Sequence, residues 1–120
     1  MNNYKELKIW QKSVDLAVTI YDVTKNFPKE EMYGLTSQLR RCAVSIPSNI
    51  AEGAGRNTKK DFNNFLGISN GSSCELETQL IIAQRIKFID SNIFNSVQQA
   101  VSEIQKMNWS LKKSLNLTQD

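Results

Sequence analysis

The chain has 120 residues, of which 40% are hydrophobic and 22% are charged, a balance typical of a single soluble domain spanning residues 1–120. Its formal net charge of +3 permits contact with nucleic acid but does not require it. The sequence has no histidine, only two distant cysteines and no apolar run near the ~20 residues of a membrane helix. We therefore expect no metal, no cofactor and no membrane contact, and a cytoplasmic protein whose thiols are reduced.

The first predicted helix lies within "KIWQKSVDLAVTIYDVTKNF", residues 8–27. Apolar and small side chains recur at helical spacing and predict the inward face, which consists of Trp10, Val14, Ala17, Tyr21 and Thr24. The helix should end at Phe27, because the residue before a proline is pushed out of the helical region.

The second predicted helix runs from about Glu31 to about Gly55 and contains Pro47. Its apolar stripe keeps a spacing of three or four residues on both sides of the proline and comprises Leu35, Leu39, Cys42, Ile46, Ile50 and Gly53. Because the phase is kept, a continuous helix kinked at Pro47 is favoured over a break. A proline inside a helix costs about 3 kcal/mol, so another interaction must offset it. Gly55 suits the left-handed position after a helix end.

Two further helices complete the chain. Thr58 and Asp61 form a T-x-x-D capping pattern, so Thr58 is the expected N-cap of the third helix. The expected inward face of this helix is Phe62, Phe65, Leu66, Ser69, Ser73, Leu76, Leu80 and Ala83. Its small residues should let a neighbouring helix approach closely. The fourth helix should begin at Asp90 or Ser91, with an inward face of Ile93, Val97, Ala100, Ile104, Met107, Leu111 and Leu115. The sequence thus predicts an all-α, up-down-up-down four-helix bundle.

The face of the second helix opposite its apolar stripe has an unusual composition. It carries three serines, two arginines and a glutamate: Ser37, Arg41, Ser45, Ser48, Glu52 and Arg56. Serine is a weak helix former, and solvated faces usually carry long charged side chains. We interpret this face as the contact with a partner subunit, which would also offset the cost of the internal proline. A merely tolerated polar surface is the alternative.

Positive charge is densest around the second helix and the start of the third, at Arg40, Arg41, Arg56, Lys59 and Lys60. These five residues are the candidate nucleic-acid-binding set, since arginine binds phosphate through two hydrogen bonds and a helix N-terminus also attracts anions. For Arg40 and Arg41, ion pairs with Glu75 and Glu77 are an equally plausible use. No catalytic constellation is present, so we expect a protein that is not an enzyme. No exposed aromatic platform is evident, so base-specific readout is not expected.

Several segments resemble one known family, notably "YGLTSQLRRCAVSIPSNIAEGAGR" and "DFNNFLGISNGSSCELETQL". They look like the four-helix-bundle proteins encoded within intervening sequences of bacterial 23S ribosomal RNA genes. The match covers roughly residues 5 to 88, and its SIPSNIAEG block is highly specific. The resemblance implies a ring-like homopentamer without enzyme activity. It also implies kinship with the basic, pentameric accessory protein of diversity-generating retroelements, which works with a reverse transcriptase and nucleic acid.

The family's motif arginines correspond to Arg40, Arg41 and Arg56, whereas Cys42 departs from the usual small apolar residue after the arginine pair. Two functional hypotheses follow. The first is an oligomeric module that binds RNA or DNA. The alternative is a scaffold for protein–protein interaction, whose ring binds another protein and whose arginines serve subunit contacts.

Overall fold

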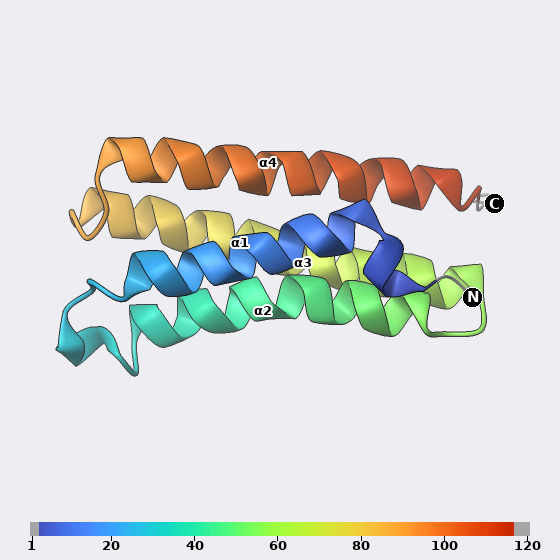
Figure 1. Ribbon diagram of the computed structural model, residues 1–120, viewed down its shortest axis with the longest axis horizontal. Coiled ribbons are helices and arrows are strands. Elements are labelled where there is room, and N and C mark those ends of the chain that lie inside the picture. Colours follow the sequence, from blue (N-terminus) through green and yellow to red (C-terminus); the bar gives the residue numbers. More distant parts are fainter. Residues whose placement is uncertain (1–2, 117–120) are drawn as a thin grey trace.

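The computed structural model describes residues 3–116 as an antiparallel bundle of four helices (Figure 1). They are α1 (Lys8–Thr24), α2 (Leu35–Ala54), α3 (Lys59–Arg85) and α4 (Ser91–Ser114). A 3-10 turn, η1 (Tyr4–Glu6), precedes α1, and a second, η2 (Lys29–Glu31), lies in the α1–α2 connection. The predicted all-α, up-down-up-down bundle is confirmed. The bundle measures 45 × 24 × 20 Å, so its two ends are well separated.

Side-chain caps set where α3 and α4 begin. The Thr58 hydroxyl accepts a hydrogen bond from the Asp61 amide at 3.1 Å, as the capping pattern predicts. Asp90 caps α4 by accepting from the amide of Ile93 at 2.8 Å. The expectation for Gly55 was wrong. Its φ is −82°, which any residue adopts, because α2 ends in an ordinary right-handed turn whose amide bonds back to preceding carbonyls.

α2 continues through Pro47 from Leu35 to Ala54, and Ile46 and Ile50 on either side are fully buried. The predicted continuity of the helix is therefore confirmed, while the bend at the proline stays a prediction. Pro47 is itself buried within its own chain, and the Ser69 hydroxyl of α3 donates to the Ile46 carbonyl beside it at 3.0 Å. Packing within the chain itself thus helps to offset the cost of the proline.

α2 and α3 approach closely at Gly53. A methyl group at this position would lie 2.6 Å from Phe65 Cβ and 3.0 Å from Phe62 Cδ1, so only glycine fits. Two buried serines of α3 also contact α2, as expected of small residues: Ser69 bonds to the Ile46 carbonyl and Ser72 to the Ser45 hydroxyl. The third, Ser73, instead accepts a hydrogen bond from Gln105 of α4. The two glycines of α3 do not share this role. Gly71 has no neighbouring atom within 4 Å, and Gly67 faces only a lysine of α4.

The rotation of α1 and α4 about their axes differs from the prediction. In α1, Tyr21 is 44% exposed and the buried residues are Ile9, Ser13, Leu16, Ala17, Ile20 and Thr24. In α4, Ile93 is 39% exposed and the buried residues are Val97, Val101, Ile104 and Asn108. Both inward faces are shifted by about one position, because each of these helices offers two apolar stripes and the neighbouring helices select one. The predicted inward faces of α2 and α3 hold at most positions.

Candidate nucleic-acid interface

Three segments meet at one end of the bundle: the N-terminal segment, the α2–α3 connection and the C-terminal end of α4 (Figure 1). We call this the basic end, because the following cations lie on these segments: Lys5, Lys8, Arg56, Lys59, Lys60, Lys112 and Lys113. All are exposed except Lys112, which is half-buried. The acidic residues on the same segments are fewer, namely Glu6, Glu52 and Asp61. At the opposite end of the bundle, acidic residues balance the cations of the α1–α2 and α3–α4 connections. They are Asp22, Glu30, Glu31 and Asp90.

Arg56 is held in a defined position within this end. Its guanidinium donates to Glu52 Oε2 one helical turn earlier at 2.9 Å, and it lies 4.9 Å from the centroid of the Phe65 ring on α3. The exposed ion pair contributes little stability but reduces the positive charge available to a ligand. None of the ion pairs within residues 3–116 involves Lys59 or Lys60. These two lysines, like Arg41, are therefore exposed cations of the predicted set that form no ion pair in this part of the chain.

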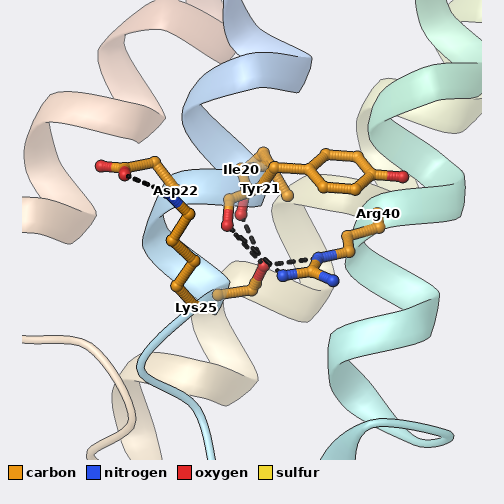
Figure 2. Close-up of polar contacts among 6 residues, drawn as sticks. Ile20, Tyr21, Asp22, Lys25 and Arg40 are labelled. Atoms are coloured by element: carbon orange, nitrogen blue, oxygen red, sulfur yellow. Dashed lines mark hydrogen bonds and ion pairs between the residues drawn. The ribbon is translucent and has the colours of Figure 1, made fainter.

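Arg40 does not belong to this interface. It reaches from α2 to the C-terminal end of α1, far from the basic end (Figure 2). Its Nε donates to Thr24 Oγ1 at 2.9 Å, and its guanidinium lies 4.6 Å from the centroid of the Tyr21 ring. Within residues 3–116, Arg40 forms no ion pair with Glu75 or Glu77. Its guanidinium donates instead to the Thr24 hydroxyl and the Tyr21 carbonyl of α1.

Arg41 is exposed on an open groove between α2 and α3, together with Glu75, Ser37 and Cys42. Burial raises the pKa of the Cys42 thiol, and the nearby Glu75 carboxylate raises it further, against smaller opposing effects of Gln79 and Arg41. Cys42 thus stays a neutral thiol at neutral pH. Arg41 lies in the first half of α2, whereas Arg56 follows the end of this helix, so the structure divides the predicted cations into separate places rather than one cluster.

The residues of α2 that were predicted to contact a partner subunit also differ in their surroundings. Ser45 is half-buried, and its hydroxyl shares a 2.8 Å hydrogen bond with the Ser72 hydroxyl of α3. It therefore serves packing within the protomer. Ser48, Glu52 and Arg56 are exposed, and Val44, one turn before Ser48, is 41% exposed. The exposed apolar side chain of Val44 beside the small side chain of Ser48 is compatible with a surface that another chain covers.

Sequence reasoning missed one site. Trp109 on α4 is 64% exposed, and Lys113 Nζ lies 4.8 Å from its ring centroid. The expectation that no aromatic platform is exposed was therefore wrong. The signal was present as a tryptophan at helical spacing from three lysines, Lys106, Lys112 and Lys113.

Within residues 3–116, no group of three or more histidine, cysteine, aspartate or glutamate side chains could hold a metal ion. None of the helices in this part of the chain combines the length and apolar character needed to cross a membrane.

The fold and these surfaces define a small all-α bundle with a basic end and open grooves between its helices. The family of 23S rRNA-intervening sequence proteins matches residues 5–110, and the chain belongs to this family. A similar solved structure is a protein with unknown function from the S23 ribosomal protein family of Bacteroides thetaiotaomicron. It is 28% identical, with a TM-score of 0.82 over 88% of this chain and 95% of that one. No curated protein matches this chain significantly.

Proposed function

We propose that this protein is a cytoplasmic, non-enzymatic homo-oligomer that binds nucleic acid, RNA in particular, through its basic end. The observation that carries the proposal is the gathering of exposed cations from three segments distant in sequence at one end of the bundle. Solubility charge alone would not require this arrangement, because the opposite end mixes both signs. Lysines and arginines presented together attract phosphate backbones without regard to sequence.

Oligomerisation would strengthen weak contacts. The resemblance to the intervening-sequence proteins implies a pentamer, and five copies of a chain with net charge +3 would carry about +15. Symmetry would repeat Arg56, Lys59 and Lys60 around a ring, so that several phosphate contacts act together. The exposed part of the α2 face, at Val44 and Ser48, is the surface we assign to the subunit contact.

The alternative function, a scaffold that binds another protein, is favoured by a specific observation. Two of the three arginines that match the family motif are engaged within the chain: Arg40 bonds to Thr24, and Arg56 pairs with Glu52. Arginines that serve the fold are not available to phosphate. A direct measurement of nucleic-acid binding distinguishes the two functions.

The test titrates the protein with a structured RNA and with duplex DNA at low salt, then at rising salt. We expect binding to both, with an affinity that falls steeply with salt because counterions are released. The variant Arg56→Ala, Lys59→Ala, Lys60→Ala should flatten the slope of log affinity against log salt and leave the sedimentation coefficient unchanged. The matched control is Arg85→Ala, Lys87→Ala, which removes exposed cations from the opposite end and should leave the slope unchanged. No binding to either nucleic acid at micromolar protein would reject the proposal in favour of the scaffold.

A further inference from the structure

An open groove runs between α3 and α4 next to the basic end. Its volume is about 700 Å³, within the range of sites that bind small molecules or single nucleotides. Its lining includes two asparagines of α3 and, from α4, a glutamine, the exposed tryptophan and two lysines: Asn63, Asn70, Gln105, Trp109, Lys112 and Lys113. The groove thus combines an aromatic ring, amide groups and positive charge on one surface.

Trp109 stands at the edge of this groove, one residue away from the buried face of α4. The adjacent residue, Asn108, occupies the inward position of α4 and donates from Nδ2 to the Leu66 carbonyl of α3 at 2.9 Å. This bond fixes the spacing of the two helices at the groove floor. Trp109 also lines a second, smaller hollow on α4 with Lys106 and Ser110. A large ring that borders two hollows and is 64% exposed leaves much apolar surface in contact with water.

The lysines lie where a phosphate beside a stacked base would need them. Lys112 reaches across the groove to α3, where its Nζ would lie 3.5 Å from a methyl group at Gly67. Lys113 Nζ contacts the Trp109 ring. Neither lysine takes part in an ion pair within residues 3–116, so both charges are available to a ligand.

The opposite end of the groove carries Glu77, which would repel phosphate. Its carboxylate accepts hydrogen bonds from the amides of Gln98 and Gln105, so it is held in place on α3. The groove is therefore polarised along its length. An anionic ligand is directed to the part formed by Trp109, Lys112 and Lys113, which adjoins the basic end.

We propose that this groove is a binding site for single-stranded nucleic acid. One base stacks on the Trp109 ring, Lys112 and Lys113 contact the adjacent phosphates, and the amides of Asn63 and Asn70 reach base edges. A duplex does not offer this mode, because the faces of its bases are already stacked on one another. The inference rests on the proposed nucleic-acid function and adds a preference for unpaired strands.

The experiment uses the full chain with Trp10→Phe, which leaves Trp109 as the only tryptophan. A single-stranded oligonucleotide should quench its fluorescence on binding, and the duplex of equal length should quench it far less. Trp109→Ala should weaken single-strand affinity by about tenfold, the usual effect of losing one stacked base. Trp109→Phe should retain most of the affinity, and duplex affinity should be the same in all three proteins.

The matched control is Tyr33→Ala, which removes another exposed aromatic ring, 97% exposed, at the opposite end of the bundle. It should leave single-strand affinity unchanged. If Trp109→Ala also leaves it unchanged while the substitutions at Arg56, Lys59 and Lys60 reduce it, this site is wrong and the proposed function stands. If the parent binds neither strand form, both fail. If Trp109→Ala changes the sedimentation coefficient, the ring belongs to a subunit contact and the site is rejected.

Discussion

At the scale of single residues, Arg40 shows how the fold decides the use of a charge. A guanidinium in an arginine pair is equally suited to phosphate, to carboxylate or to neutral oxygens. Here Thr24 and the Tyr21 carbonyl at the end of α1 supply the acceptors, and the Tyr21 ring covers one face. Arg40 is thus a structural tie between α1 and α2.

This role predicts the effect of Thr24→Val. The substitution keeps the shape of the side chain but removes the hydroxyl that accepts from Arg40 Nε, so we expect the free energy of unfolding in urea to fall by about 1–2 kcal/mol. Thr78→Val is the control, because its hydroxyl also bonds to the carbonyl four residues earlier but meets no arginine. It should change stability by less than about 0.5 kcal/mol. Equal losses in the two variants would show that the Arg40 bond contributes nothing.

A second prediction at this scale concerns Cys42 and pH. Because the pKa of its thiol is raised in the folded state, folding favours the neutral form. The stability linked to this group is fully present below the pKa of the unfolded thiol and is lost as pH rises through the folded pKa. Unfolding measured between neutral and alkaline pH should therefore show a decline that Cys42→Ala reduces.

In the Cys74→Ser protein, where Cys42 is the only thiol, alkylation by iodoacetamide should show a midpoint at higher pH than a free cysteine. A midpoint at or below that of free cysteine would contradict the assignment.

At the scale of elements, the contact between α2 and α3 depends on Gly53. Gly53→Ala would gain about 1 kcal/mol in helix propensity, but its methyl group would overlap Phe65 Cβ, so the helices must separate at a cost of about 1–3 kcal/mol. We expect net destabilisation, seen as a lower urea midpoint. Gly71→Ala is the matched control in α3, where no atom lies within 4 Å and the propensity gain should stabilise the protein. A stabilised Gly53→Ala protein would mean that the close approach is not rigid.

At the scale of the whole molecule, the two serines of the α2 face should respond differently to glutamate. Ser48 is exposed, so Ser48→Glu should dissociate the proposed oligomer in sedimentation while circular dichroism and monomer stability persist. Ser45 bonds to Ser72 inside the protomer, so Ser45→Glu should instead lower monomer stability. Ser96→Glu, on an exposed position of α4, is the control for added charge. A parent that sediments as a monomer, or an intact oligomer in Ser48→Glu, would reject the assigned subunit contact.

The sequence by itself determined the number and order of the helices, the caps of α3 and α4 and the passage of α2 through Pro47, whereas α1 ends at Thr24 rather than Phe27 and α2 begins at Leu35 rather than near Glu31. These features depend on contacts between near neighbours, such as the cap from Thr58 to Asp61, and on the phase of one apolar stripe. Only the tertiary structure decided the rotation of α1 and α4, the partner of Arg40 and the exposure of Trp109. Each depends on a helix distant in sequence: Arg40 of α2 donates to Thr24 of α1, sixteen residues earlier, and Asn108 of α4 donates to the Leu66 carbonyl of α3, so that the neighbouring Trp109 faces water. Periodicity defines the faces of a helix, but the neighbouring helices select which face is buried.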